Sequence, residues 1–443
     1  MKLNDEFILA AEEAKKVAFS FSDPLIVHHY DADGLSSGAI VKNAFVLANL
    51  KHRMLGIKKL NDAIIEKLRN EKEIIFVDLG NNERVRELKD VIIIDHHQLK
   101  DNGKHQINPF MYGIDGGSEL SSSGTAYVVF RNNADLGLIG ALGDMQYPLQ
   151  GANKTICEEG INKGEIKKSV DLRFYGRYSR PLAQFLAYND EPFIPGISYN
   201  EERAQLLLES LKIEQKKNEN EQCGQCEQWR VYHDLVFEER QKLISAIAEL
   251  LSQYGRKYTL IGEVYDLPKR PVKLCDAHEF STILNACGRH GKPELGIAIC
   301  LGDEAGYSEA LDFLILHKRM IKEGISFAKK SIIDLGVFLF LDARGVIDEG
   351  IIGTVCGMVL QNENKPIIGI ANGENGDIKV STRTYKRTGI NLGILVSEAS
   401  KNIGGSGGGH AVAAGASVPK DKLNEFLIAM KETITRQIRQ KAK

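Results

Sequence analysis

Three short runs of apolar, largely β-branched residues constrain the fold of this chain more than any other feature. They cover residues 24–28, 74–77 and 91–94, and a helical pattern over residues 38–50 follows the first of them. Continuous apolar runs separated by helices are typical of strands buried on both faces of a parallel sheet. We therefore expect an α/β fold whose N-terminal domain is built around a parallel sheet.

Acidic and imidazole side chains follow each of these runs at the point where the strand should end. They are Asp31 and Asp33 after the first run, Asp78 after the second, and Asp95, His96 and His97 after the third. The carboxyl ends of parallel strands meet at one edge of a sheet, and open α/β sheets bind ligands at that edge. The sequence therefore predicts that these side chains converge.

A turn of the form Asp31-Ala32-Asp33-Gly34 can simply cap the following helix. The other acids change that interpretation, because Asp78 and Asp144 are expected at the same edge and so many carboxylates would repel without cations. Carboxylates and imidazoles without a thiolate suit Mn²⁺ or Mg²⁺. Two such ions, about 3.5–4 Å apart, can activate water and neutralise a phosphodiester during in-line displacement.

Composition narrows the class of protein. At 443 residues the chain should form two or three compact units, and with 43% hydrophobic and 26% charged residues it has no apolar run that could cross a membrane. The first residues do not form a signal peptide and the seven cysteines do not form a disulfide framework, so we expect a cytoplasmic protein. The net charge of −2 means that nucleic-acid binding would need a local basic patch or metal ions.

The pattern changes along the chain and predicts three regions, residues 1–197, 198–331 and 332–443. The second is a helical connector and middle segment, with helical patterns over 199–215 and 236–254. The third is a smaller α/β domain with strands at 337–341, 367–370 and 378–381, followed by glycines between 404 and 409. Cys223 and Cys226 have the spacing of zinc ligands but no second pair, so we favour buried thiols over a zinc site.

Taken together, the motifs resemble those of the DHH phosphoesterases. The likeness rests on the order and spacing of Asp31-Ala32-Asp33-Gly34, Asp78, Asp95-His96-His97 and Asp144. The segment 404–415 is similar to the DHHA1 substrate-binding domain, and segments 191–196 and 279–289 resemble archaeal RecJ-like proteins. The resemblance therefore covers nearly the whole chain, and it implies an active site in a groove between the DHH and DHHA1 domains.

The resemblance also implies roles for individual residues near the sheet. Two Mn²⁺ or Mg²⁺ ions would be held by Asp31, Asp33, Asp78, His96 and Asp144, with Asp78 as the bridge. His29 is a conditional sixth ligand, because bacterial RecJ-like motifs usually carry an acid at this position. His97 would contact the scissile phosphate, and Asp95 would orient the imidazoles that follow it.

Substrate-binding residues are expected at a distance from the metal ligands. By resemblance, Arg383 would pair with a substrate phosphate, and the backbone of Gly408 and Gly409 would approach a phosphate closely beside His410. For Arg289 two roles stay open, a contact with a phosphate and a structural ion pair. Lone aromatic residues could stack on bases or belong to the core; they are Tyr112, Tyr127 and Tyr147.

The resemblance favours a metal-dependent exonuclease that takes single-stranded DNA or RNA and releases mononucleotides. A phosphodiesterase for short oligonucleotides or cyclic dinucleotides is an alternative, although such relatives are typically shorter. A non-catalytic replication scaffold is a third, against which the complete ligand set argues. Replication or repair proteins are the partners that the resemblance implies, while strand polarity and the choice between DNA and RNA stay open.

Overall fold

The computed structural model describes the chain apart from residues 1–3, 82, 100–104, 190–191, 218–227, 254–259, 361–364, 374–375, 386–387, 402, 410 and 442–443. The chain divides into two compact units, Met1–Phe313 and Leu314–Lys443. The boundaries predicted after residues 197 and 331, and the groove between domains, stay predictions. Cys223 and Cys226 lie outside the described residues, so the preference for buried thiols over a zinc site stays a prediction from the sequence.

Five parallel strands form the central sheet of the first unit. They are β1 (Leu25–His29), β2 (Arg53–Ile57), β3 (Glu73–Val77), β4 (Asp90–Ile94) and β5 (Gln106–Ile107), in the order β2-β1-β3-β4-β5. The expected parallel sheet is confirmed. The sequence pattern missed the two edge strands: β2 is largely open to solvent and alternates in burial, and β5 has only two residues.

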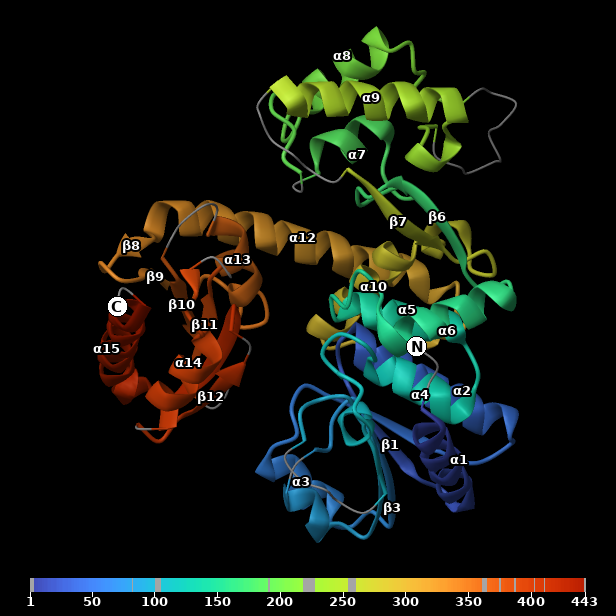
Figure 1. Ribbon diagram of the computed structural model, residues 1–443, viewed down its shortest axis with the longest axis vertical. Coiled ribbons are helices and arrows are strands. Elements are labelled where there is room, and N and C mark those ends of the chain that lie inside the picture. The colour runs from blue at the N-terminus through green and yellow to red at the C-terminus, as the bar shows by residue number, and fades with distance from the viewer. Residues whose placement is uncertain are drawn as a thin grey trace. The chain divides into compact units, whose positions relative to one another are not determined.

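Apolar side chains cover both faces of this sheet, as its continuous apolar strands require. On one face α3 (Asp62–Leu68) and the 3₁₀ helix η1 (Glu83–Glu87) pack on Val27, Phe76 and Ile93. On the other face lie α1 (Asp5–Ser20), α2 (Ala32–Leu47) and α4 (Ser122–Phe130). Figure 1 shows α3 and α1 on opposite sides of β1 and β3.

Helix α2 is the centre of the first unit. It contacts α4, α5 (Ala134–Gly143), α10 (Ala277–Arg289) and α11 (Pro293–Cys300), and its first ten residues are buried. The predicted helix over residues 38–50 began too late and ended too late. Asp31 caps the helix by accepting a hydrogen bond from the backbone N–H of Gly34, so α2 begins directly after the acidic turn.

The described residues between 151 and 266 form a helical layer on a two-stranded antiparallel ribbon. The ribbon is β6 (Lys167–Leu172) with β7 (Ile261–Asp266), and α6 (Gly151–Asn162) precedes it. Between the strands lie α7 (Leu182–Ala187), α8 (Glu201–Ser210) and α9 (Phe237–Gln253), with η4 (Tyr232–Asp234), around their own apolar core. The helical patterns predicted over 199–215 and 236–254 contain α8 and α9, but the ribbon was not predicted.

A buried arginine ties this ribbon to the start of α10. Arg177 is 3% exposed, and its Nη1 lies 3.0 Å from both Asp266 Oδ1 and Asp276 Oδ2. Asp276 also caps α10 by accepting from the backbone of His278 and Glu279. Because buried charges need partners, this pairing fixes where α10 begins, after the short η5 (Val272–Leu274).

The second unit holds a mixed sheet of six strands in the order β12-β13-β11-β10-β9-β8. The long α12 (Gly306–Ser331) leads into it, and the elements that follow are β8 (Ile333–Asp334), β9 (Leu339–Asp342), α13 (Ile352–Val359), β10 (Ile367–Asn372), β11 (Ile378–Arg383), α14 (Leu392–Lys401), β12 (Ser406–Gly409), β13 (Ala413–Val418), η8 (Lys420–Lys422) and α15 (Leu423–Lys441). Helices α14 and α15 cover one face and α13 the other. The glycine-rich segment forms the edge strand β12.

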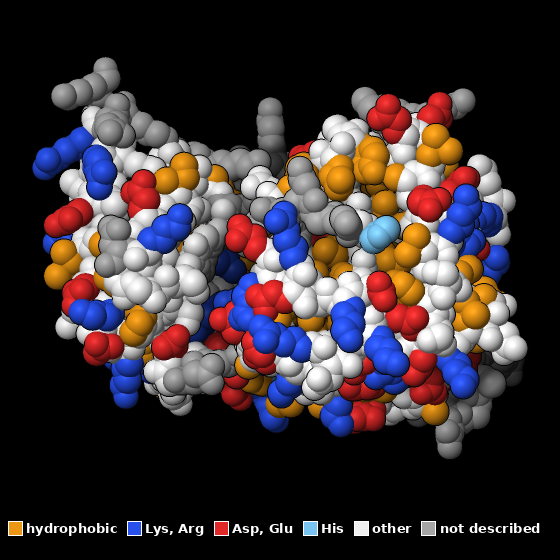
Figure 2. All heavy atoms as spheres, turned by 90° about the horizontal axis from the view of Figure 1, so that it is seen from below, with side chains coloured by type: hydrophobic (Ala, Val, Ile, Leu, Met, Phe, Trp, Pro, Cys, Tyr) orange, Lys and Arg blue, Asp and Glu red, His pale blue; other side chains and the backbone are white. Residues whose placement is uncertain are grey.

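Charge of both signs is spread over the surface. Figure 2 shows Lys and Arg side chains mixed with Asp and Glu over the face that it draws, as the net charge of −2 suggests. Because neither sign of charge dominates, attraction for a polyanion must come from local groups.

No helix in the described part of the chain is long and apolar enough to cross a membrane.

Candidate metal centre

The carboxyl edge of the parallel sheet gathers the predicted side chains. His29 ends β1, Asp78 follows β3 directly, and Asp95 follows β4 directly. Since β1, β3 and β4 are neighbours in the sheet, these positions lie side by side. The predicted convergence is therefore present, and it divides into three overlapping groups of possible ligands.

The first group consists of His29, Asp31 and Asp78. His29 Nδ1 lies 2.9 Å from Asp31 Oδ2 and 3.2 Å from Asp78 Oδ2. Burial opposes protonation of His29, but the two carboxylates outweigh it and hold the pKa of the imidazole well above its ordinary value. Asp31 uses its other oxygen to cap α2 at 3.0 Å from Gly34 N, so it serves the helix and the site together.

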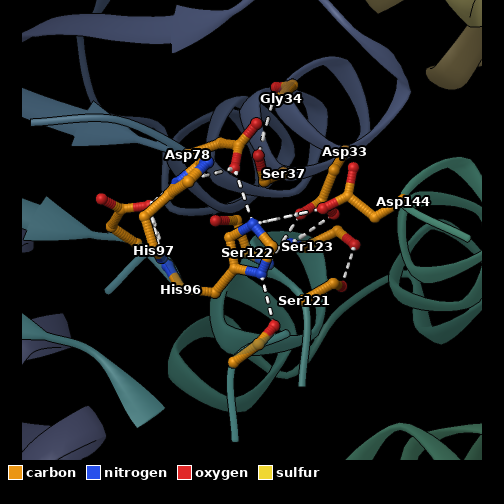
Figure 3. Close-up of polar contacts among 12 residues, drawn as sticks. Asp33, Gly34, Ser37, Asp78, His96, His97, Ser121, Ser122, Ser123 and Asp144 are labelled. Carbon is orange, nitrogen blue, oxygen red and sulfur yellow. Dashed lines mark hydrogen bonds and ion pairs between the residues drawn. The ribbon is translucent and has the colours of Figure 1, made fainter. Parts of the chain in front are cut away.

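The second group consists of Asp33, His96 and Asp144, which is the residue that caps the end of α5. His96 Nε2 lies 3.2 Å from Asp144 Oδ2 and 3.8 Å from Asp33 Oδ2. It is also 3.4 Å from Asp78 Oδ1. Asp78 therefore turns one oxygen to His29 and the other to His96, and it links the two groups, as Figure 3 shows for the His96 side.

Asp33 is fixed by the start of α4. Its oxygens accept hydrogen bonds from the backbone N–H groups of Ser122 at 2.7 Å and Ser123 at 2.9 Å. Burial, and then the charges of Asp144 and Asp78, raise the pKa of Asp33 to about 8. Helix N-termini favour anions, so α4 is positioned to hold this carboxylate.

Sequence reasoning missed these serines, although a signal was present. Ser121 caps α4, and a run of serines before an apolar stretch is a typical helix start. Nothing in the sequence linked that helix start to Asp33, 89 residues earlier. Gly140 was missed as well: a Cβ there would lie 2.2 Å from Asp33 Oδ1 and 2.1 Å from Ser123 Oγ, so only glycine lets α5 come so close.

The orientation of His96 is set by a backbone carbonyl. His96 Nδ1 lies 2.8 Å from the Gly116 oxygen and donates to it, which leaves Nε2 directed at the carboxylates. Gln146 Nε2 donates to the same oxygen at 2.8 Å, and Asn153 in turn donates to Gln146. Gln146 and Asn153 therefore hold the ring from behind, a role that their positions in the sequence did not suggest.

The third group consists of Asp78, His96 and His97, and His97 also pairs with Asp95. His97 Nδ1 lies 2.7 Å from Asp95 Oδ1, and the His97 side chain is 58% exposed whereas that of Asp95 is 1% exposed. Burial alone would lower the pKa of His97, but the carboxylates of Asp95 and Asp78 outweigh burial and raise this pKa to about 9. The roles predicted for them, phosphate contact and orientation, stay predictions that this geometry permits.

The site has the properties of a cation-binding centre. Asp78 Oδ1 and His96 Nε2 are buried and make no well-aligned hydrogen bond among the described residues, although the carboxylates of Asp144 and Asp78 lie 3.2 and 3.4 Å from the imidazole nitrogen. Buried polar atoms are rarely left in that state. Asp78 also has a left-handed backbone conformation, with φ of 62°, which residues other than glycine rarely adopt. Carboxylate and imidazole donors facing one another around these atoms fit divalent ions such as Mn²⁺ or Mg²⁺.

Helix α10 supports the acidic turn of this site. Asn285 Oδ1 accepts from the backbone N–H of Ala32 at 3.0 Å. A Cβ at Gly288 would lie 1.6 Å from the carbonyl oxygen of Tyr30, so the helix backbone packs directly on the turn. Arg289, the next residue, is half-buried in the last turn of α10. The segment 279–289 therefore has a structural role, and a phosphate contact by Arg289 stays a prediction.

The predicted substrate-binding residues of the second unit lie at one end of its sheet. Arg383 pairs with Ala413 on β13, and Gly409 on β12 pairs with Ala414. Arg383 Nη1 donates to the Thr382 carbonyl at 2.8 Å, and Gly353 of α13 leaves room for its guanidinium. Gly408 borders open space, which would let a ligand approach the backbone. His410 lies outside the described residues.

The three tyrosines that were considered for base stacking have different surroundings. Tyr127 is fully buried in α4 and its hydroxyl donates to Glu159 at 2.6 Å, so it belongs to the core and not to a base-stacking surface. Tyr112, in η2 (Pro109–Tyr112), packs on Phe7 with ring centroids 5.2 Å apart. Tyr147 lies in the loop that follows the turn at Asp144.

Comparison with known proteins identifies three domains in the sequence. Residues 24–144 match the DHH family, N-terminal domain; residues 174–263 match the DHH-CID domain; and residues 336–436 match the DHHA1 domain. An uncharacterized protein of Methanocaldococcus jannaschii is 30% identical over 459 residues, covering 97% of this chain and 99% of that protein.

Solved structures share the fold at low sequence identity. RecJ from Thermus thermophilus in complex with Mn²⁺ has a TM-score of 0.60 and 17% identity, covering 98% of this chain but only 55% of RecJ. An exonuclease RecJ bound to manganese has a TM-score of 0.57 and 16% identity, covering 98% of this chain and 96% of that one. CDC45 from Entamoeba histolytica has a TM-score of 0.61 and 13% identity, covering 97% and 99%.

Proposed function

The chain belongs to the DHH family of metal-dependent phosphoesterases, and we propose that it is an exonuclease that hydrolyses single-stranded DNA or RNA to mononucleotides. The observation that carries the proposal is the position of Asp78. One of its oxygens lies 3.2 Å from His29 Nδ1 and the other 3.4 Å from His96 Nε2. A carboxylate between two ligand groups is what a pair of bridged ions requires.

The proposed ligands divide between the two ions. His29 and Asp31 would hold one, Asp33, His96 and Asp144 would hold the other, and Asp78 would bridge them. Bound divalent ions would supply an activated water and neutralise the charge of the phosphodiester. His97 donates to Asp95 through Nδ1, which leaves Nε2 to donate to a phosphate oxygen. With a pKa of about 9, His97 carries a proton and a positive charge at neutral pH.

Two features favour a polymeric substrate. The DHHA1 match spans the sheet end that carries Arg383, Gly408 and Gly409, whose chemistry suits a phosphate or a terminal nucleotide. The long middle segment, matched as DHH-CID, adds protein that a short-substrate phosphodiesterase would not need. Because one structural relative is an exonuclease and another is CDC45, we also propose a replication or repair protein as partner, in the cytoplasm.

The experiment that tests this function uses 20-nucleotide single strands of DNA and RNA, each labelled at either end, with Mn²⁺, Mg²⁺ or EDTA. We expect metal-dependent release of mononucleotides and little cleavage of a blunt duplex. A dinucleotide cleaved much faster than the 20-mer would favour the short-substrate alternative. An Asp31→Ala, Asp33→Ala variant with the activity of the unmodified protein would show that these carboxylates do not carry the reaction.

Metal binding should release protons. His29 and His96 have pKa values well above the ordinary value and that of Asp33 is about 8, so the metal-free site holds protons near neutral pH that ions must displace. Affinity for Mn²⁺ should therefore rise between pH 6.5 and 8.5, by about tenfold per pH unit for each proton released. Calorimetric titration in two buffers of different ionisation enthalpy counts the protons. A binding enthalpy that does not depend on the buffer would contradict the prediction.

A further inference from the structure

We infer that Arg173, whose guanidinium lies on the ring of Tyr147, binds a backbone phosphate of the nucleic acid beside the metal centre. This inference rests on the proposed function and deepens it, because it names a contact that distinguishes a polymer from an isolated phosphodiester. It is independent of the second unit, since both residues belong to Met1–Phe313.

Tyr147 is close to the metal centre along the chain. It lies three residues after Asp144, and Gln146 between them reaches back to the carbonyl that holds His96. Three Cα–Cα steps of about 3.8 Å place the two Cα atoms within roughly 11 Å of each other. A group on Tyr147 is therefore within a few nucleotides of a phosphodiester held at the ions, and it would meet a neighbouring phosphate and not the scissile one.

The ring of Tyr147 forms a fixed platform. Its hydroxyl donates to the carbonyl of Glu263 on β7 at 3.2 Å. The ring of His278, in the first turn of α10, meets it edge-on, with centroids 5.7 Å apart and planes at 71°. The Arg173 Cζ atom lies 4.0 Å from the Tyr147 ring centroid. This is the shortest of the cation–ring contacts among the described residues, and it presents the guanidinium in one orientation.

No described residue neutralises the charge of Arg173. Arg173 is exposed, and no carboxylate of a described residue lies within 4.0 Å of its nitrogen atoms. Nearby arginines differ: Arg177 is paired with Asp266 and Asp276, and Arg240 with Asp171 at 3.0 Å. On a protein of mixed surface charge and net charge −2, an ordered cation without a carboxylate partner among the described residues marks a place for an anionic ligand.

The ribbon behind the platform makes room for this arrangement. Arg173 follows β6, and its backbone N–H donates to the Leu260 carbonyl at 3.2 Å. A Cβ at Gly262 on β7 would lie 2.5 Å from Arg173 Cδ and 3.2 Å from the Tyr147 hydroxyl. A larger residue at position 262 would therefore require the Arg173 side chain to move, which provides a second way to test the contact.

A stacked guanidinium suits a phosphate diester in particular. Its planar fork of donors can bind two phosphate oxygens at once, which a lysine ammonium cannot do in the same way. The alternative is that the Arg173–Tyr147 contact only stabilises the ribbon. A structural role would change the stability of the protein and would affect all substrates equally, so the two roles can be separated.

The test compares two substrates and four variants with Mn²⁺. The substrates are a labelled 12-nucleotide single strand and bis(p-nitrophenyl) phosphate, which has no neighbouring phosphate. In Arg173→Ala and Gly262→Ala we expect the ratio of kcat/KM for the strand to kcat/KM for the small diester to fall at least about tenfold, mainly through KM. Arg173→Lys should recover part of the loss. Arg131→Ala is the matched control, because Arg131 also lies over a tyrosine, Tyr127, but is paired with Glu159.

Binding without turnover keeps the inference separate from the proposed function. With Ca²⁺ in place of Mn²⁺, fluorescence anisotropy of the labelled strand should show weaker binding in Arg173→Ala. The slope of log Kd against log salt concentration should also fall by about one, because one phosphate contact is lost. An unchanged salt dependence and substrate ratio would overturn the inference while the exonuclease proposal stands. A protein that binds the strand through Arg173 but cleaves neither substrate would overturn the proposed function alone.

Discussion

Replacing Asp78 by asparagine should abolish metal-dependent hydrolysis, with a loss of at least about a thousand-fold in kcat/KM. Asparagine is almost the same size as aspartate and can still accept the hydrogen bond from His29. It cannot supply a second negative oxygen toward His96, 3.4 Å away. If Asp78 bridges two ions, the variant should bind fewer than two Mn²⁺ per chain.

The same substitution should make the metal-free protein more stable. Burial, and then the charge of Asp31, raise the pKa of Asp78 to about 6 from an ordinary value of 3.8. The ionised carboxylate therefore destabilises the folded protein above about pH 6, and the penalty disappears below pH 3.8. At pH 7.5 we expect Asp78→Asn to raise the free energy of unfolding by on the order of 1 kcal/mol.

Denaturant unfolding with and without Mn²⁺ measures both effects. The unmodified protein should gain stability from Mn²⁺ by mass action, about 2.7 kcal/mol at a hundred times Kd, and Asp78→Asn should gain much less. Asp90→Asn is the control, since Asp90 is an exposed carboxylate at the start of β4. A metal-free Asp78→Asn protein less stable than the unmodified one, with normal activity, would show that Asp78 is a structural residue.

Replacing Gly140 by alanine should disrupt the metal centre without altering any proposed ligand. Alanine in a helix is normally favoured over glycine by about 1 kcal/mol. Here the new Cβ would lie 2.2 Å from Asp33 Oδ1 and 2.7 Å from Ser123 Cβ, and Ser123 is fixed at the start of α4. Overpacking should therefore destabilise the protein by about 1–3 kcal/mol and displace Asp33.

Gly137→Ala, on the same helix, is the matched control. Its nearest neighbour would be Ile156 Cγ2 at 3.3 Å, which needs to move by only a few tenths of an ångström, so the loss of stability should be small. We expect Gly140→Ala to lose most Mn²⁺ affinity and most activity, and Gly137→Ala to keep both. Equal behaviour of the two variants would mean that the approach of α5 to Asp33 does not matter for the site.

The parallel sheet and the convergence at its edge were predictable because they depend on local patterns. Continuous apolar runs mark buried strands, and residues after parallel strands must meet at one edge. The same reasoning placed the start of α2 six residues too late, because it counted the helical pattern only from Gly38 although Asp31 caps a helix that begins at Ala32. The short edge strand β5 leaves too weak a pattern to find.

The groups that support the proposed ligands could not be predicted, because they arise from contacts between distant segments. Ser122 meets Asp33 across 89 residues, and Asn285 meets Ala32 across 253. Serine and asparagine are common in loops and helices, so their types carry no sign of these partners. Arg173 was missed for a related reason: its position on Tyr147 depends on the β6–β7 ribbon, whose strands were not predicted and lie about 90 residues apart in the sequence.

The central claim is a pair of ions bridged by Asp78, and a crystal grown with Mn²⁺ tests it most directly. Anomalous difference maps at the manganese edge should show two peaks about 3.5–4 Å apart at the carboxyl edge of the parallel sheet. One peak should lie within bonding distance of His29 and Asp31, the other of Asp33, His96 and Asp144, and both of Asp78. A single peak, or two peaks that Asp78 does not touch, would contradict the account.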